Sequence, residues 1–236
     1  MHKKSEGSER QSRAVVIHDK LRLAILSRQL QPGAKLVEEE IAEVYEVSRT
    51  LVRTALQALH HDNLVEIRPR RGAFVAQPTM REAREVFDAR LLIEPVVAGL
   101  AASRATPEDV QGLQDKLDAE RKAMDSHADA QAVLLSSAFH LRIASIAGHD
   151  LYASYVRGLC SRSSLIIGQH WRNRTSLCGC DAHQDLVGAI AANRPEEASR
   201  IMRLHLEEII AGVNLEAMEA PRTRLADILL SLDEES

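Results

Sequence analysis

Apolar residues in the first quarter of the chain recur at the spacing expected for amphipathic helices. Ile17, Leu21, Ala24 and Ile25 follow an i, i+4, i+7, i+8 pattern, and the predicted helix ends before Gln31-Pro32-Gly33. A second short helix is predicted over about 38–45, with an inner face formed by Ile41, Val44 and Tyr45. Three acidic residues, 38–40, begin this helix and suit the positive end of its dipole.

A third predicted helix carries an apolar stripe and a polar stripe. Ser48 is a suitable N-cap residue, and the apolar stripe consists of Val52, Ala55, Leu56 and Leu59. The polar stripe consists of Arg49, Arg53 and Gln57, with Thr50 alongside. In the major groove, Arg can donate two hydrogen bonds to guanine, Gln can pair with adenine, and Thr or Arg can hold phosphates. A solvated helix face has the same composition, so this helix alone leaves both interpretations open.

Two short apolar runs follow, at residues 64–67 and 73–76, and predict a pair of β-strands. The turn between them, Arg68-Pro69-Arg70-Arg71-Gly72, carries three arginines. A solvated surface hairpin could have such a turn. Three short helices followed by an arginine-tipped hairpin are nevertheless the element order of a winged helix-turn-helix, whose wing reaches the DNA backbone or minor groove. The order of elements therefore favours DNA binding, with Arg70 at the wing tip.

Beyond residue 78 the pattern changes to a series of longer helices without any strand pattern. Thr79-Met80-Arg81-Glu82 is a capping box, and Thr106-Pro107 marks another helix start. We predict helices over about 79–103, 107–125, 128–147, 150–171, 180–193, 195–213 and 221–232. The predicted fold class is mostly α: a disordered tail at 1–14, a winged helix-turn-helix at 15–78, and an antiparallel bundle of six or seven helices at 79–232.

Composition supports this organisation. The 236 residues are 45% hydrophobic but only 3% aromatic, which suits two modest helical cores better than a β-sandwich. The net charge of −4 divides unevenly, because residues 1–78 hold 13 Lys and Arg against 10 Asp and Glu, and the remainder holds 17 against 24. This division fits a DNA-facing N-terminal domain joined to an acidic domain.

The sequence argues against a secreted or membrane protein. Three cysteines are too few for a disulfide-built fold, and no stretch approaches the roughly 18 apolar residues that a membrane span needs. The first 13 residues lack the apolar core of a signal peptide, so we expect a cytoplasmic protein. Cys178-Gly179-Cys180 could offer soft metal ligands or a redox-sensitive thiol pair, but a lone CxC is a weak motif and we interpret it as an incidental loop.

Several segments of the N-terminal part resemble the GntR family of bacterial regulators. They are Leu30-Gln31-Pro32-Gly33, Val47-Ser48-Arg49-Thr50, Val52-Arg53, Asn63-Leu64-Val65 and Arg71-Gly72-Ala73-Phe74-Val75. The resemblance implies that DNA is contacted by Arg49, Thr50, Arg53, Arg71 and Gly72. The family usually has a Pro after the Arg-Thr pair and a Glu after the second Arg, where this chain has Leu51 and Thr54. The missing Glu would remove an acid that could orient Arg53, so sequence preference is expected to differ.

The helical region is similar to the ligand domain of the FadR-like branch, called the FCD domain. The similar segments are Arg90-Leu91-Leu92-Ile93-Glu94, Phe139-His140-Leu141, His183-Gln184-Asp185-Leu186 and Arg203-Leu204-His205-Leu206. In that branch three histidines on separate helices bind a divalent metal, together with an Asp four residues before the first histidine. The resemblance therefore implies His140, His183 and His205 as ligands, and it places Ser136 at the position of the Asp.

Residues 136 and 140 lie one turn apart on one helix face, but a serine cannot supply the anionic oxygen. The sequence therefore predicts weaker metal binding, or a shell completed by water or by the effector. Imidazole suits Zn, Ni, Fe or Mn, and three histidines leave positions open for a carboxylate. Arg90 could form a simple helix ion pair with Glu94. The resemblance instead implies that Arg90 clamps an effector carboxylate, with Ser136 nearby.

Together these expectations predict a transcription regulator, most simply a repressor, that is switched by a small organic acid. A homodimer would place two recognition helices on a pseudo-palindromic operator, and the acid would shift the helical domain between two packings. The alternative class is a metal-dependent enzyme that uses the three histidines, but no acid lies at the matched positions and no HExxH motif or nucleophile elbow occurs. A second alternative is a helical module with a purely structural metal, in which effectors would not alter DNA binding.

Overall fold

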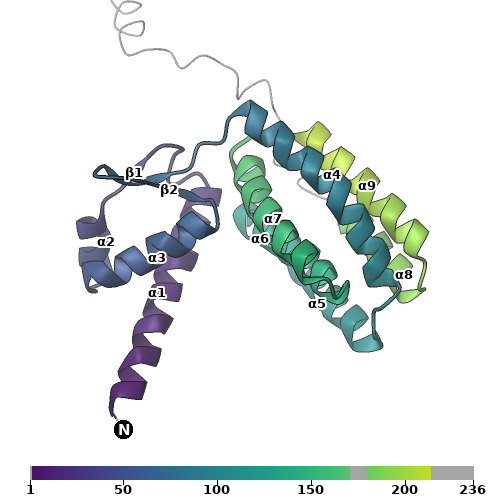
Figure 1. Ribbon diagram of the computed structural model, residues 1–236, viewed down its shortest axis with the longest axis horizontal. Coiled ribbons are helices and arrows are strands. Elements are labelled where there is room, and N and C mark those ends of the chain that lie inside the picture. The colour runs from purple at the N-terminus through teal and green to yellow at the C-terminus, as the bar shows by residue number, and fades with distance from the viewer. Residues whose placement is uncertain (1, 171–179, 214–236) are drawn as a thin grey trace, which may run out of the picture.

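The computed structural model describes residues 2–170 and 180–213, and it describes side chains from residue 13 onward. Figure 1 shows two domains joined by the segment between residues 75 and 80. The N-terminal domain extends from α1 (His2–Leu26) to β3 (Gly72–Val75). The C-terminal domain extends from α4 (Met80–Ala102) to α9 (Pro195–Gly212). The mostly helical fold class predicted from the pattern of apolar residues is confirmed.

The N-terminal domain packs three helices against a small antiparallel sheet. Its other elements are β1 (Lys35–Leu36), α2 (Glu38–Val44), α3 (Arg49–His61) and β2 (Val65–Arg68). The strands lie in the order β1-β3-β2, and β2 and β3 form the predicted hairpin, with Val65 paired to Val75 and Arg68 to Gly72. The two-residue strand β1 was not predicted, because it is too short to show a period-two pattern.

The core of this domain contains the apolar stripes that the helical periodicity placed inward. Ile17 and Ile25 of α1 are at most 1% exposed. The buried stripe of α3 consists of Val52, Ala55, Leu56 and Leu59. Ser48 caps α3, because its hydroxyl accepts a hydrogen bond from the backbone N–H of Leu51 at 3.3 Å. The packing of the third helix therefore leaves its polar stripe on the opposite, solvent-facing side.

Two local features of this domain differ from the expectations. The described part of the tail predicted at 1–14, from His2 onward, belongs to α1, and no proline interrupts the chain before the buried turns of this helix. The Arg13 guanidinium also donates to the Tyr45 carbonyl at 2.9 Å. Val44 is 75% exposed rather than inward, because neighbouring helical residues are rotated by about 100° and the two-turn helix α2 turns Tyr45 toward the core instead.

The C-terminal domain is an antiparallel helical bundle. Between α4 and α9 its helices are α5 (Pro107–Asp125), α6 (Asp129–Ile146), α7 (Asp150–His170) and α8 (Cys180–Ala191). The predicted capping box begins α4 at Thr79, and α5 begins at the predicted start after Thr106, where the structure also shows a capping box. The described part of the bundle has six helices, and the helix predicted at 221–232 lies outside the described residues. No helix in the described ranges is long and apolar enough to cross a bilayer.

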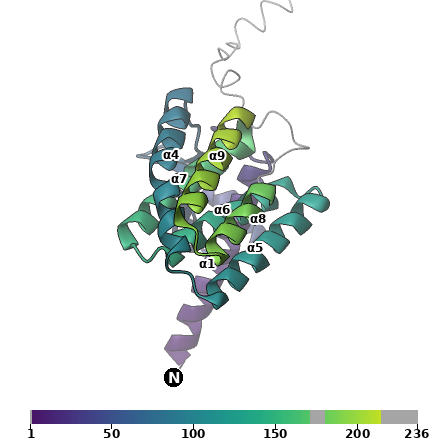
Figure 2. The same cartoon turned by 90° about the vertical axis from the view of Figure 1, so that its right-hand side faces the viewer.

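Figure 2 looks onto the bundle from the side of α4 and α9, which pack along each other. Phe87, Phe139, Leu113, Leu117 and Ile143 are among its largest buried side chains. The helices α6, α8 and α9 each turn one histidine into this interior. The bundle thus brings together three polar side chains that lie far apart in the sequence.

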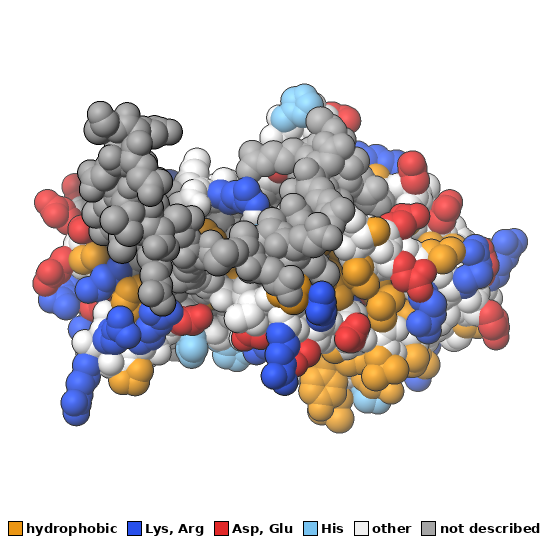
Figure 3. All heavy atoms as spheres, turned by 90° about the horizontal axis from the view of Figure 1, so that it is seen from above, with side chains coloured by type: hydrophobic (Ala, Val, Ile, Leu, Met, Phe, Trp, Pro, Cys, Tyr) orange, Lys and Arg blue, Asp and Glu red, His pale blue; other side chains and the backbone are white. Residues whose placement is uncertain are grey.

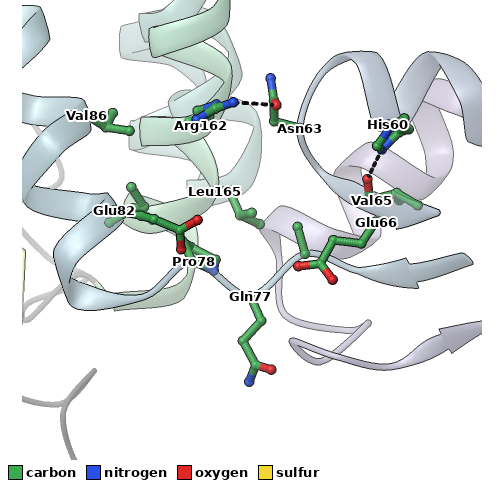
Figure 4. A pocket seen from close by; sticks show the side chains of 12 residues that line it. His60, Asn63, Val65, Glu66, Gln77, Pro78, Glu82, Val86, Arg162 and Leu165 are labelled. Carbon is green, nitrogen blue, oxygen red and sulfur yellow. Dashed lines mark hydrogen bonds between the residues drawn. The ribbon is translucent and has the colours of Figure 1, made fainter. Parts of the chain in front are cut away.

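One helix of the bundle, α7, also forms much of the junction with the N-terminal domain. Leu165 belongs to the apolar cluster of the N-terminal domain rather than to the core of the bundle. The Arg162 guanidinium donates to the Asn63 side-chain oxygen at 3.0 Å, as Figure 4 shows, and the Ser161 hydroxyl donates to the Asp62 carbonyl. Asp62 and Asn63 follow directly after α3. The junction therefore connects α7 to the end of the third helix.

Candidate functional site

The polar stripe of α3 lies on the surface, as the sequence predicts. Arg49, Thr50, Arg53 and Gln57 are all exposed. Figure 3 shows basic side chains gathered, with some acidic ones among them, at the end of the molecule that the N-terminal domain forms. Because α3 buries its opposite stripe, these four side chains project together from a rigid element. The arrangement is suited to reading the major groove.

Two acidic residues of α2 hold the arginines of α3. The Arg49 guanidinium donates to Glu39 at 2.6 Å, and the Arg53 Nε donates to Glu38 at 2.9 Å. Arg53, through its hydrogen bond and charge, lowers the pKa of Glu38 below its usual range. Glu38 therefore orients Arg53 from the neighbouring helix, although the Glu that the family usually has on α3 is replaced by Thr54. Sequence reasoning missed this role, because it assigned residues 38–40 only to the helix dipole.

The wing predicted from the arginine-rich turn lies between β2 and β3. Arg70 and Gly72 have positive φ angles of 60° and 96°, and Arg70, Arg71 and Gly72 are exposed. Arg68 is different, because it bonds Glu66 at 2.7 Å and lies 4.5 Å from the centre of the Phe74 ring. Two arginines at the tip are thus available for a DNA backbone, and the third stabilises the hairpin.

Three histidines meet in the interior of the bundle. His140 of α6, His183 of α8 and His205 of α9 are at most 2% exposed. Their Nε2 atoms are 3.0 Å apart for His183 and His205, 3.3 Å for His205 and His140, and 3.4 Å for His183 and His140. Among the described residues these three form the group of side chains that could hold a metal ion. The predicted ligand histidines therefore lie together.

Carboxylates bind the outer nitrogens of two of these rings. His140 Nδ1 is 2.6 Å from a Glu94 oxygen, and His183 Nδ1 is 2.8 Å from a Glu120 oxygen. A carboxylate only accepts, so each Nδ1 carries the proton and each Nε2 turns its lone pair toward the other histidines. Burial lowers the pKa of His140, and burial with the nearby charges lowers the pKa of His205 well below its usual value. Neutral imidazoles are the form that binds metals.

The distances fit a divalent metal bound by all three rings. The Nε2 lone pairs of His140 and His183 face each other at 3.4 Å and repel, whereas a cation between them would attract both. Nitrogens bound at about 2.0–2.1 Å to one metal are roughly 2.8–3.4 Å apart for octahedral to tetrahedral angles. The three observed separations agree with this range. The Nδ1 atom of His205 is buried without a hydrogen-bond partner in the described part of the chain, so this ring lacks the support that the other two have.

Arg90 forms the helix ion pair and also faces a cavity. Its guanidinium donates to Glu94 at 2.5 and 3.2 Å and to the Ser163 hydroxyl at 2.9 Å. Burial opposes ionisation of Glu94, but the charge of Arg90 and the hydrogen bonds from His140 and Arg90 outweigh it and lower the pKa of Glu94 to about 2. Glu94 therefore remains a carboxylate that binds both Arg90 and His140. Glu120 and Ser163 were not predicted, since nothing local in their sequence neighbourhood marks a partner on another helix.

A small space, which we call the histidine cavity, lies beside the rings of His140 and His205. It has a volume of about 30 Å³ and is lined by Arg90, Ser136, His140, Cys160, Ser163 and His205 among others. Ser136 is thus beside the histidines, at the position that the resemblance gave to an Asp. Burial raises the pKa of the Cys160 thiol, so it stays protonated and uncharged. Of the CxC pair, Cys180 lies against Met124 at 3.3 Å, and Cys178 is outside the described residues.

Comparison with known proteins agrees with both domains. Residues 13–75 match the gntR family of bacterial regulatory proteins, and residues 85–208 match the FCD domain. The chain is 29% identical to the transcriptional repressor RspR of Escherichia coli over 196 residues, which cover 82% of this chain and 85% of that protein. It is also 29% identical to the transcriptional regulator LutR of Bacillus subtilis over 215 residues, covering 80% and 96%.

Solved structures have the same fold. McbR/YncC of E. coli superposes with a TM-score of 0.71 at 22% identity and covers 84% of this chain and 95% of its own. A GntR regulator from Rhodococcus sp. RHA1 superposes with a TM-score of 0.69 at 25% identity, covering 89% and 100%. The relatives are transcription regulators rather than enzymes. The chain is therefore a DNA-binding transcription regulator that belongs to the GntR family of bacterial regulatory proteins and carries an FCD domain.

Proposed function

We propose that the protein is a repressor whose affinity for its operator is switched by a small organic acid bound at a metal in the FCD domain. The observation that carries this proposal is the convergence of three Nε2 atoms within 3.4 Å of one another, with carboxylates behind two of the rings. His140, His183 and His205 would hold the metal, which when bound supplies a positive charge that attracts a carboxylate. Zn, Ni, Fe and Mn all accept this set of ligands.

The acid would bind on the side of the histidine cavity where Arg90 and Ser136 lie. One guanidinium nitrogen of Arg90 donates a hydrogen bond to the Ser163 hydroxyl, and the other two donate to Glu94. An effector carboxylate could therefore replace the Ser163 hydroxyl as the acceptor. A cavity of about 30 Å³ has room for only one or two water molecules. An organic acid must therefore enlarge it, and the enlargement moves α7 relative to α6 and α9.

The same helix connects the cavity to the DNA-binding domain. Cys160, Ser163 and Ser164 of α7 line the histidine cavity. Between them in sequence, Ser161 contacts Asp62 and Arg162 contacts Asn63, both directly after α3. Figure 4 shows the contact of Arg162 with Asn63. A displacement of α7 by the acid would therefore reach the recognition helix through direct contacts. Two packings of α7 would supply the two states that differ in operator affinity.

Operator binding of this kind also needs two recognition helices, so we propose a homodimer. Leu92 and Val96 on α4 and Leu151 and Tyr155 on α7 are large apolar residues that are 49–75% exposed. The helices α4 and α7 pack against each other, so these residues belong to adjacent helices of one domain. Figure 3 shows apolar side chains gathered along one edge of the helical domain. Exposed apolar residues of this size are typical of subunit contacts.

The test is thermal unfolding of the full chain with a panel of small organic acids, before and after treatment with EDTA. We expect metal in the purified protein, a lower melting temperature after chelation, and one acid that raises the melting temperature only when metal is present. The same acid should change the affinity for an operator selected from random DNA. No response to any acid and no effect of chelation would contradict the proposal.

A pair of histidine variants separates the metal site from other effects. His183→Gln should lose the metal, measured by elemental analysis, because it removes one of three ligands. His61→Gln should keep the metal, because His61 is an exposed residue of α3. The structural-metal alternative predicts a different result. Chelation would then remove the metal without changing DNA binding, and no acid would alter DNA binding.

A further inference from the structure

A second cavity lies between the two domains, on the side of α7 that faces α1. It has a volume of about 200 Å³ and is lined by residues of α1, α6, α7 and the end of α3. We call it the junction cavity. The side chains that matter for its chemistry are Arg22, Asp62, Ser137, Arg157, Ser161 and Ser164. Ser137 and Ser164 also line the histidine cavity, so the two cavities share a wall.

The charges around the junction cavity favour an anion. Arg22 and Arg157 have no hydrogen bond or ion pair with any described residue, and the Nε atom of Arg22 is buried without an acceptor. One acidic residue lines the cavity, Asp62, and its carboxylate is bound by His18 at 2.8 Å. The hydrogen bond that His18 donates to Asp62 raises the pKa of His18, so part of this negative charge is already neutralised. Two guanidinium groups therefore lack a counter-charge.

A buried cationic donor without an acceptor is costly, so its presence needs an explanation. The guanidinium fork binds carboxylate and phosphate oxygens in pairs. Hydroxyl groups add further contacts: Ser161 donates to the Asp62 carbonyl and Ser164 to the Cys160 carbonyl, whereas Ser137 makes no hydrogen bond with the described residues and is available to donate. The volume is below the roughly 300–1,000 Å³ of drug-sized ligand sites, which indicates a small molecule.

We propose that the junction cavity is a second ligand site, for a small molecule with a carboxylate or phosphate group held by Arg22 and Arg157. Arg22 is on α1 of the DNA-binding domain and Arg157 is on α7 of the helical domain, so one anion bridges the two domains. It lies beside Asp62, directly after α3. Occupancy therefore fixes the recognition helix relative to α7, independently of any metal at the histidines.

The test is calorimetric titration of the full chain with inorganic phosphate and with malonate, at constant ionic strength because salt screens exposed charges. Each titration is made before and after EDTA treatment. The variants are Arg22→Gln and Arg157→Gln, and the matched control is Arg203→Gln, which removes the same charge from an exposed position on α9. Arg157 is exposed, so its variant keeps the fold even where the half-buried Arg22 affects stability.

We expect at least one probe to bind the wild type and the Arg203→Gln variant with equal affinity. The same probe should bind the Arg22→Gln and Arg157→Gln variants about tenfold more weakly. EDTA should not change this binding, which distinguishes it from an acid bound at the histidines. Preference for phosphate would identify a phosphorylated ligand, and preference for malonate a carboxylic acid. The proposal is overturned if neither probe binds, if all variants bind equally, or if EDTA abolishes binding.

Discussion

Among the single residues, Glu38 of α2 holds two arginines of the predicted DNA-reading face of α3. It bonds the Nε of Arg53 through both oxygens at 2.9 Å and also lies 3.4 Å from Arg49. An arginine that reads a base must enter the groove in one orientation, whereas an arginine that binds phosphate tolerates several. Glu38 should therefore affect discrimination between sequences more than overall affinity.

We predict that Glu38→Gln lowers the ratio of operator to random-DNA affinity by about tenfold, the scale of one base contact. Affinity for random DNA should be unchanged or higher, because the substitution removes a negative charge near the phosphates. Fluorescence anisotropy with selected and random duplexes measures both values. Glu40→Gln removes the same charge from an exposed position of the same helix and serves as the control. An equal loss for both variants would mean that Glu38 does not orient Arg53.

At the scale of elements, the contact of α1 with α7 depends on a glycine. A Cβ atom at Gly168 would lie 2.9 Å from the Leu26 carbonyl oxygen, a backbone atom that cannot move aside alone. The Arg28 guanidinium donates to the Gly168 carbonyl at 3.1 Å at the same place. The two helices are thus held at a distance that only glycine permits, so the domain junction is close-packed at this point.

We predict that Gly168→Ala destabilises the protein by about 1–3 kcal/mol, the usual cost of overpacking, and lowers its melting temperature by several degrees. Gly158→Ala is the matched control on the same helix, because no atom lies within 4 Å of its Cβ position. Alanine is the better helix former by up to about 1 kcal/mol, so this variant should be neutral or slightly stabilised. If both variants melt alike, the approach of α1 to α7 is not tight in solution.

For the whole molecule, the division of charge sets how DNA is approached. The chain carries a net charge of −4, yet its first 78 residues have more basic than acidic side chains. The excess of acidic residues therefore lies in the helical domain, which repels phosphates and favours approach through the N-terminal domain. Binding should weaken steeply as salt rises, because each phosphate that the protein neutralises releases counterions.

We predict that replacing Arg70 and Arg71 by Gln makes the salt dependence of DNA binding less steep. The negative slope of log affinity against log salt should shrink in magnitude by about 0.9 for each phosphate that these arginines neutralise in the wild type. The measurement is anisotropy on random duplex DNA over a series of salt concentrations. Arg121→Gln with Arg203→Gln makes the same charge change on the helical domain and should leave the slope nearly unaltered. An unchanged slope in the wing variant would mean that the wing does not touch DNA.

Local features of the chain were predictable because they depend on neighbours in sequence. The capping box at Thr79, the helix start at Thr106, the buried stripe of α3 and the arginines of the wing follow from periods and motifs of a few residues. The three histidines of the candidate metal site were different. They are 43 and 22 residues apart in sequence, so only the resemblance to a known domain grouped them.

The sequence by itself determined the elements other than β1, their order and the polar face of α3. The tertiary structure alone decided which carboxylates support the histidines, that Glu38 holds Arg53, and that Arg22 and Arg157 line one cavity. Periodicity states which side of a helix is buried but not which helix covers it. Contacts between distant residues depend on how helices pack, and that is set by the summed shape of many side chains.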